Sequence, residues 1–507
     1  MACVIAIDAG TTGVRALVVD EAGTVTDIAY REITQHFPQP GWVEHDAGEI
    51  WDAVVVTLGE VAARLETSGT AVAAIGITNQ RETVVAWDRS SGRPLHRAIV
   101  WQDRRTAERC DALREAGHLP LVRELTGLVL DPYFSATKMA WLLDTGGVER
   151  GPGLVLATVD AWVVWNLTGG PGRGVLATDV TNASRTLLFD IRSLAWSDEL
   201  GELFGVPRSA LPEVRPSCGR IGSVGGALAE QMPLLAGVPV SGIAGDQQSA
   251  LFGQSCTEPG MAKVTYGTGS FVLLNVGETC PPPSEGLLTT VAWDLGDHGG
   301  DAPVAYALEG AVFVTGAAIQ WLRDGLGLID TAADIGPLAA QIADTEGVYV
   351  VPAFTGLGSP WWDPYARGTI TGLTRGTGAA HVARAVVEAT AFQVRDVIDA
   401  MALAGCPVAA LRVDGGAAVL DLLLQMQADQ LRVVVARPRT TETTALGAAT
   451  LAGLAEGMWA NLGELEAIWK LDAQFSPVAT AVAADRAHDG WTRAVGRSRG
   501  WAAPIAT

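Results

Sequence analysis

Two glycine-rich turns, about half a chain apart, constrain the fold more than any other feature of the sequence. The first, Asp8–Gly13, joins two apolar, β-branched runs that predict strands. The second, Gly267–Ser270, stands between strand-like segments at residues 261–266 and 271–276. An internal duplication, in which each half opens its own sheet on a glycine hairpin, is the simplest interpretation, although one short repeat can also arise by chance.

Between and after these turns, strand-like segments alternate with amphipathic helical segments. The predicted strands lie over residues 4–7, 14–19, 71–78, 84–87, 347–352, 411–413 and 433–435. The predicted helices lie over residues 104–116, 135–143, 317–326, 379–401 and 419–430. This alternation predicts an α/β fold with mixed sheets that are flanked by helices. A change in character near residues 239–245 predicts two domains, over residues 1–243 and 244–507.

Composition and charge exclude several other classes of protein. A chain of 507 residues, 48% hydrophobic and 18% charged, is too long for one core and too apolar for disorder. Its net charge of −21 argues against nucleic acid or an anionic membrane as the main partner. None of its three lysines follows a glycine, which excludes a Walker A loop. Six scattered cysteines and no apolar run of membrane-spanning length predict a cytoplasmic protein without a membrane span.

The glycine turns suit phosphate binding without a lysine. Successive backbone N–H groups in such a turn can surround an anion, and threonine hydroxyls add further donors. A third glycine motif, Asp414–Ala417, joins a predicted strand to a helix, where a phosphate or nucleoside can approach closely. Asp8 ends the first strand, where a carboxylate could hold Mg²⁺. Each turn alone could be an ordinary hairpin, but two that face each other would clamp the phosphates of a nucleotide.

Longer segments carry a family resemblance. Residues 76–83, 98–106 and 126–135 closely resemble the glycerol-phosphorylating branch of the FGGY carbohydrate kinase family, within the actin-like ATPase superfamily. The same holds for residues 245–248, 306–310, 352–367 and 414–417. The resemblance runs from Ile5 to about Trp459. It implies two actin-like (ribonuclease H-like) domains with the active-site cleft between them, and phosphorylation of glycerol to sn-glycerol 3-phosphate with ATP and Mg²⁺. Members of the family commonly form homodimers or homotetramers.

The resemblance also implies the acceptor site. Arg81 and Glu82 would supply a donor fork and a carboxylate to a vicinal diol, although such a pair is otherwise common on surfaces. The aromatic rings of Trp101 and Phe271 would pack against the carbon face, although lone aromatic residues more often fill a core. The complete set expected to bind glycerol is Arg81, Glu82, Trp101, Tyr133, Asp246, Gln247 and Phe271.

Asp246 is the expected general base, because a carboxylate within hydrogen-bond reach can accept the proton of the attacking hydroxyl. A structural role at the start of the following helix also fits this residue, and both roles are compatible. Asp8 and Asp246 are the expected Mg²⁺ ligands. The residues expected to bind ATP are Thr11, Thr12, Gly13, Arg15, Gly267, Thr268, Gly316, Gln320 and Gly416. Arg15 would offset charge in the transition state.

Some positions depart from the family pattern, and two alternative functions remain. Leu420 and Asp421 occupy the place of an asparagine pair that helps to hold adenosine, so relaxed nucleotide selectivity is expected. Ala9 and Gly13 replace a usual glutamine and serine in the first turn. A kinase of another small polyol or ketose is the first alternative, which a substrate panel distinguishes. A non-catalytic ATP-driven binding or filament protein is the second, and the complete polyol set argues against it.

Overall fold

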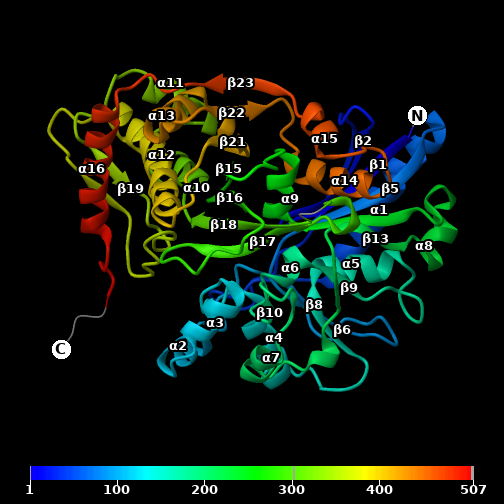
Figure 1. The fold of residues 1–507 in the computed structure, drawn as a ribbon. Coiled ribbons are helices and arrows are strands. Elements are labelled where there is room, and N and C mark those ends of the chain that lie inside the picture. Colours follow the sequence, from blue (N-terminus) through cyan, green and yellow to red (C-terminus); the bar gives the residue numbers. More distant parts are fainter. Residues whose placement is uncertain (1, 301–302, 504–507) are drawn as a thin grey trace.

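The computed structural model describes residues 2–300 and 303–503, and two mixed β-sheets form its centre (Figure 1). The strands of the N-terminal sheet are, in spatial order, β13 (Cys218–Ser223), β14 (Pro239–Gly245), β5 (Ala71–Asn79), β1 (Ala2–Ala9), β2 (Gly13–Asp20) and β3 (Val25–Glu32). The first glycine turn joins the antiparallel pair β1 and β2. Strands β5 and β14 run parallel to β1, on its other side.

The C-terminal sheet repeats this arrangement. Its strands are, in spatial order, β17 (Leu288–Asp294), β18 (Val304–Val312), β16 (Ser270–Gly277), β15 (Met261–Tyr266), β21 (Ala410–Asp414), β22 (Val435–Pro438) and β23 (Leu471–Phe475). The second glycine turn joins the antiparallel pair β15 and β16, and β21 and β22 run parallel to β15. Strands β15, β16, β18, β21 and β22 therefore match β1, β2, β3, β5 and β14 in order and direction, as the duplicated turns predict.

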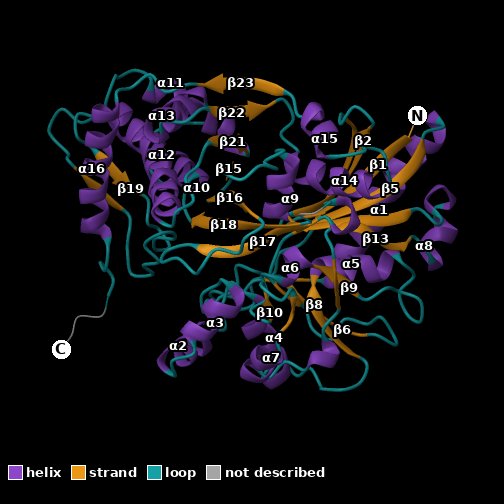
Figure 2. Ribbon diagram, viewed as in Figure 1, coloured by secondary structure: helices purple, strands orange, loops and turns teal. Residues whose placement is uncertain are grey.

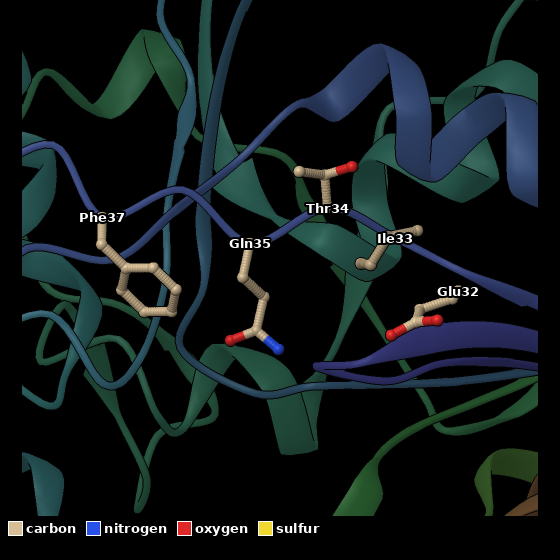
Figure 3. A pocket seen from close by; sticks show the side chains of 5 residues that line it. All are labelled: Glu32, Ile33, Thr34, Gln35 and Phe37. Atoms are coloured by element: carbon tan, nitrogen blue, oxygen red, sulfur yellow. The ribbon is translucent and has the colours of Figure 1, made fainter.

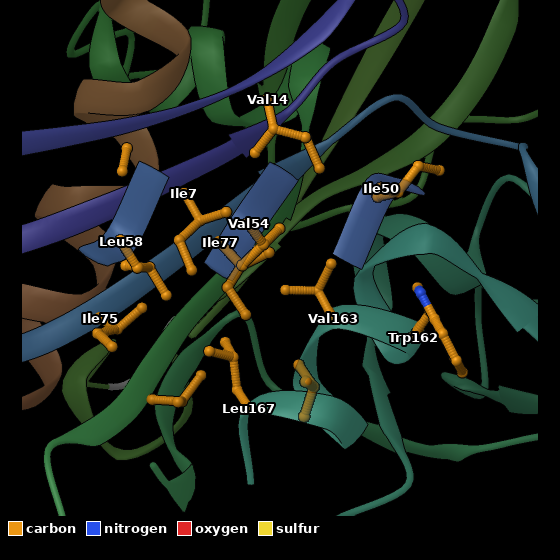
Figure 4. Close-up of a cluster of buried hydrophobic side chains, with 14 of the residues drawn as sticks. Ile7, Val14, Ile50, Val54, Leu58, Ile75, Ile77, Trp162, Val163 and Leu167 are labelled. Atoms are coloured by element: carbon orange, nitrogen blue, oxygen red, sulfur yellow. The ribbon is translucent and has the colours of Figure 1, made fainter. Parts of the chain in front are cut away.

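Helices α1 (Ala47–Ser68) and α5 (Val159–Leu167) cover one face of the N-terminal sheet (Figure 4). The Asp46 side chain caps α1 by accepting the Gly48 and Glu49 amides, and Gly69 ends the helix with φ +66°. Apolar residues at helical spacing, such as Val54 and Leu58, pack against Ile75 and Ile77 of β5 in the same buried cluster. Truncation of one of these side chains to alanine typically costs about 2–5 kcal/mol.

The opposite face of the N-terminal sheet packs against α14 (Thr443–Ala455), which comes from the far end of the chain. Together with α9 (Asp246–Gly253), α14 lies between the two sheets (Figure 1). Glycines allow the close approach, since a Cβ atom on Gly76 would lie 2.1 Å from the Ala448 carbonyl oxygen. The predicted domain boundary between residues 243 and 244 falls near the end of β14. The C-terminal half nevertheless supplies one cover of the N-terminal sheet.

The remaining elements surround these two sheets (Figure 2). In the N-terminal half they are β4 (Glu44–His45), β6 (Val84–Asp88), β7 (Ala98–Ile99), β8 (Leu154–Thr158), β9 (Ala177–Asp179), β10 (Phe189–Asp190), β11 (Ala195–Trp196), β12 (Glu213–Arg215), α2 (Ala107–Glu115), α3 (Leu119–Thr126), α4 (Ser135–Asp144), α6 (Val180–Ala183), α7 (Asp198–Phe204) and α8 (Gly226–Gln231). In the C-terminal half they are β19 (Tyr349–Val351), β20 (Thr369–Thr371), α10 (Gly316–Asp324), α11 (Ile335–Ala339), α12 (Ala379–Leu403), α13 (Asp421–Leu431), α15 (Leu462–Ile468) and α16 (Ala481–Ser498). Within the described ranges, no helix has both the length and the apolar character needed to cross a membrane.

Two predicted elements are displaced near the third glycine motif. Helix α13 begins at Asp421 rather than at residue 419, because Leu420 is extended, with φ −87° and ψ 95°. The strand predicted over residues 433–435 is found as β22, which begins at Val435. Arg432 ends α13 in the left-handed region, and the two valines that follow it precede the paired strand.

Candidate active site

Each glycine turn is closed by a hydrogen bond between its own backbone groups. The Gly10 N–H donates to the Gly13 carbonyl at 3.0 Å, and the Gly267 N–H donates to the Gly269 carbonyl at 2.8 Å. A side chain at Gly13 would collide with the Tyr30 ring, because its Cβ atom would lie 2.4 Å from a ring carbon. Both turns therefore present backbone and small polar side chains, an arrangement that suits a phosphate.

The start of α10 packs against the second turn. The Thr315 and Ala317 amides donate to the Thr268 carbonyl at 2.9 and 3.0 Å, and the Gly316 amide donates to the Gly267 carbonyl at 3.0 Å. A Cβ atom on Gly316 would lie 2.5 Å from the Gly267 carbonyl oxygen, so the contact requires glycine. The helix start and the turn thus form one unit.

The third glycine motif adjoins the same unit. Gly415 has φ +86°, and a Cβ atom there would lie 2.5 Å from the carbonyl oxygen of Tyr266, the last residue of β15. Gly416 is exposed next to it, and Gln320 is exposed on α10 one turn after Gly316. The structure therefore gathers the predicted nucleotide residues of the C-terminal half around the ends of β15 and β21.

Asp8 lies beside the first turn and interacts with the other predicted metal ligand. Desolvation by the surrounding protein raises the pKa of Asp8 to about 7, Arg15 opposes this rise, and Asp246 and Glu442 reinforce it. Arg15 forms an ion pair with Glu442, with its Nη1 atom 2.9 Å from Oε2. This pair joins β2 to the segment that precedes α14. Thr12 is exposed, and its carbonyl accepts the amide of Ile33 at 3.1 Å.

Arg81 is the centre of the predicted acceptor site and is only 2% exposed. Its Nη1 donates to Glu309 Oε2 at 2.6 Å and to Gln248 Oε1 at 3.1 Å. Its Nη2 donates to the Tyr133 hydroxyl at 3.1 Å, and its Nε lies 3.2 Å from Asp246 Oδ1. The structure thus brings three of the predicted acceptor residues, Arg81, Tyr133 and Asp246, into direct contact.

Glu82 adopts a backbone conformation that is uncommon for its residue type. Its φ angle is +60°, in the left-handed region, and its side chain is 1% exposed. Its Oε1 accepts a hydrogen bond from Arg185 Nε at 2.7 Å and lies 3.8 Å from Arg81 Nε. A strained backbone persists only where the surrounding structure holds it, and residues with such strain are concentrated at binding and active sites.

Aromatic rings connect the acceptor residues to the first turn. The Trp101 indole Nε1 donates to Thr11 Oγ1 at 2.9 Å. The Trp101 ring lies edge-on to Tyr133 and to Phe271, with centroids 5.7 and 6.5 Å apart. The Arg81 guanidinium lies 5.9 Å from the Phe271 ring centroid. The predicted apolar walls and the predicted phosphate turn are therefore parts of one site.

Asp246 begins α9, and 32% of its side chain remains exposed, so another molecule can reach the carboxylate. Desolvation raises its pKa, and Arg81 and Lys263 oppose this rise. Its Oδ1 accepts the Gln247 amide at 2.8 Å, so the structural role at the helix start is also present. Lys263 is fully buried, and its Nζ donates to Gln247 Oε1 and, at 2.8 Å, to Thr265 Oγ1.

Three charged residues of this site, Arg185, Lys263 and Glu309, were not predicted as site residues. Each is fully buried, and Glu309 and Lys263 are the only charged residues of their largely apolar strands, β18 and β15. Burial raises the pKa of Glu309, but Arg185 and Arg81 overcome this effect and lower it to about 2. A lone charge within an apolar strand was the available signal, because such a charge is rarely buried without a partner.

A surface hollow of about 410 Å³ borders the first turn (Figure 3). Glu32, Ile33, Thr34, Gln35 and Phe37 line it, and the hydrogen bond from Ile33 to Thr12 connects it to the turn. The described residues hold no group of three or more histidine, cysteine or acidic side chains suited to a metal ion.

Comparison with known proteins identifies the class that this fold and site define. Residues 3–253 match the N-terminal domain of the FGGY family of carbohydrate kinases, and residues 262–456 match the C-terminal domain. The chain therefore belongs to the FGGY family of carbohydrate kinases. Its two-domain α/β architecture is the actin-like ATPase fold, which confirms the fold class expected from the sequence.

Several glycerol kinases are similar to this chain over nearly its whole length. The enzyme of Bordetella parapertussis is 52% identical over 99% of this chain and 98% of its own length. That of Halorhodospira halophila is 54% identical over 98% of this chain and 97% of its own length. The crystal structure of Plasmodium falciparum glycerol kinase with ADP has a TM-score of 0.92 and 33% identity, and covers 98% of both chains. A xylulose kinase from Lactobacillus acidophilus, at 21% identity and a TM-score of 0.88, shares the fold.

Proposed function

We propose that the protein transfers the γ-phosphoryl group of ATP to a terminal hydroxyl of glycerol, which forms sn-glycerol 3-phosphate and ADP. The observation that carries this proposal is the direct connection between the polyol residues and a phosphate turn, through the Trp101–Thr11 hydrogen bond. Full-length similarity to glycerol kinases supports the same acceptor. A cytoplasmic location and a homodimer or homotetramer stay predictions.

Arg81, Glu82 and Tyr133 orient the vicinal hydroxyls of the acceptor, while Trp101 and Phe271 pack against its carbon edge. A hydroxyl both accepts and donates hydrogen bonds. Arginine can donate to its oxygen, and glutamate can accept its O–H. Burial raises the pKa of Asp246, and Arg81, whose Nε lies 3.2 Å from Oδ1, opposes this rise. A raised pKa makes a carboxylate a stronger proton acceptor, as a general base requires.

In the transfer step, the oxygen of the attacking glycerol hydroxyl forms a bond to the γ-phosphorus, and Asp246 takes the proton of that hydroxyl. The bond from that phosphorus to the bridging oxygen breaks, and ADP leaves with the electron pair. The amides and hydroxyls of residues 10–13 and 267–270 hold the phosphates in line with the acceptor. The Arg15 guanidinium, which is partly exposed beside the first turn, offsets negative charge there.

The residues that would hold Mg²⁺ are Asp8 and Asp246. The fit is supported by their mutual repulsion, since Asp246 is one of the charges that raise the pKa of Asp8, and a cation between them would offset it. When bound, Mg²⁺ neutralises charge on the β- and γ-phosphates.

The proposal is tested by phosphoryl transfer from ATP to a panel of glycerol, xylulose and gluconate, measured as ADP release and as the phosphorylated product. We expect glycerol to be the best acceptor. The Asp246→Asn variant keeps the shape of the side chain and should lose about 10²- to 10⁴-fold in kcat, with glycerol still bound.

Asp190→Asn, at the end of β10 in the N-terminal half, is the matched control and should behave as the wild-type protein does. Near-normal turnover of Asp246→Asn would remove Asp246 as the base. A wild-type preference for xylulose would replace glycerol with a ketose.

A further inference from the structure

Two buried ion pairs, Arg81–Glu309 and Arg185–Glu309, connect the two halves of the chain at the acceptor site. Arg185 lies just after α6 in the N-terminal half, and Glu309 lies within β18 in the C-terminal half. Their side chains are fully buried, and Arg185 Nη2 donates to Glu309 Oε1 at 2.8 Å. We infer that Arg185 and Glu309 are positioning residues, which hold Glu82 and Arg81 in the geometry that binds the acceptor. This inference rests on the proposed function.

Glu309 fixes the plane of the Arg81 guanidinium. Its Oε2 accepts from Nη1 at 2.6 Å and its Oε1 accepts from Nη2 at 3.2 Å, which is a two-point contact. Such contacts between arginine and a carboxylate fix orientation as well as distance. With both Nη groups held, the Arg81 Nε remains directed to Asp246, 3.2 Å from Oδ1.

Arg185 fixes the second acceptor residue in a corresponding way. It divides its donors between two carboxylates, with Nε on Glu82 and Nη2 on Glu309. The ring of Phe134 lies 5.2 Å from the Arg185 guanidinium and limits its movement. The Glu82 backbone is strained at φ +60°, so this side chain depends on its partner to hold it in place.

Stability alone does not account for this cluster. Two arginines and two glutamates lose most of their hydration when buried together, and apolar side chains of equal volume often stabilise a fold as well or better. Through this cluster, Glu309 of the C-terminal half instead holds Arg81, an acceptor-binding residue of the N-terminal half. Acceptor affinity is thereby coupled to the relative position of the two halves.

The test compares kinetic constants for glycerol and ATP in two variants. Glu309→Gln keeps the shape but removes the charge, and Arg185→Lys keeps the charge but cannot bridge two carboxylates. In each, we expect the KM for glycerol to rise at least about tenfold and the KM for ATP to change less than about threefold. The two residues act on one network, so their effects should not add. The KM for glycerol of the double variant should be about that of the more impaired single variant.

Arg395→Lys is the matched control. Arg395 lies on α12, is buried and bridges Gln430 and Asp485, none of which is an acceptor residue. It should lower the melting temperature as Arg185→Lys does, but leave the KM for glycerol unchanged. Glu309→Asp restores the charge and should recover part of the loss. Variants with a lowered melting temperature and an unchanged KM for glycerol would overturn the positioning role alone, whereas a wild-type protein without glycerol activity would overturn the proposed function.

Discussion

The pKa values of buried carboxyl groups in this protein differ according to the partners of each group. Glu309 contacts two arginines, which lower its pKa to about 2 despite burial. Asp160 is equally buried but has neutral donors as partners, among them the hydroxyls of Thr158 and Thr178, both at 2.5 Å. Desolvation raises the pKa of Asp160 to about 7, Asp179 adds to this rise, and the neutral donors oppose it only in part.

Asp160→Asn should remove a pH-dependent destabilisation. The folded state keeps the Asp160 proton up to about pH 7, whereas the unfolded state loses it near pH 4. The stability that this group contributes is therefore present below about pH 4 and is lost as pH rises to 7, at about 1.4 kcal/mol per pH unit. The free energy of unfolding of the variant, relative to the wild-type protein, should rise across this window and then level off, as urea unfolding can measure.

Asp88→Asn is the control for this slope. Hydrogen bonds from Ser90 and Ser91 lower the pKa of Asp88 to about 2, so its titration lies below the window. The difference between this variant and the wild-type protein should be constant over the same pH range. Parallel curves for both variants would mean that Asp160 is ionised in the folded protein.

At the scale of elements, α14 depends on glycine for its contact with α9. A Cβ atom on Gly447 would lie 1.9 Å from the Ser249 carbonyl oxygen, which is backbone and cannot swing aside. Gly447→Ala should therefore lower the free energy of unfolding by about 1–3 kcal/mol, although alanine is the better helix former. Denaturant unfolding measures this effect.

Gly496 of α16 supplies the opposite case. A Cβ atom there meets nothing within 4 Å, so Gly496→Ala should stabilise the protein by roughly 0.5–1 kcal/mol. Equal effects of the two substitutions would show that the close contact at Gly447 has no energetic weight.

The segment before α13 carries a prediction about the nucleotide. Leu420 packs against Gly336, since a Cβ atom on Gly336 would lie 2.6 Å from Leu420 Cδ1, and it offers no hydrogen bond to a ribose or base. We expect ATP, GTP and CTP to support transfer within about tenfold of one another, because one lost hydrogen bond is worth about 1 kcal/mol. Leu420→Asn should increase the preference for ATP in the same kinetic assay. A strict preference for ATP in the wild-type protein would contradict this expectation.

The same elements show what the sequence could predict. The strand predicted over residues 261–266 coincides with β15, because an apolar run between glycines has few alternatives. No helix was predicted over residues 443–455, because α14 is apolar on every side and has no amphipathic period. Arg81 and Glu82 were predictable from a local motif, whereas Glu309 becomes a site residue only when β18 reaches them from the other half of the chain.

At the scale of the whole molecule, a net charge of −21 opposes a ligand as anionic as ATP. Asp8 and Asp246 add negative charge at the proposed phosphate site, and Glu442 occupies part of the Arg15 side chain. We therefore expect transfer to depend absolutely on a divalent cation. A chelator should abolish it and added Mg²⁺ should restore it, with added Na⁺ at equal ionic strength as the control. Residual transfer in the chelator would contradict the assignment of Asp8.

A nascent chain covers the second face of its first sheet late. All strands of the N-terminal sheet emerge before residue 246, and α1 and α5 can cover one face at once. The other face carries Val4, Ala6, Leu17 and Val19, which are buried in the same cluster as α14. These side chains stay without their cover until Thr443–Ala455 leaves the ribosome, roughly ten to forty seconds later at ordinary rates of synthesis. Folding of the first half is therefore tied to the end of translation, and chains that terminate before residue 443 expose an apolar surface that favours aggregation or capture by chaperones.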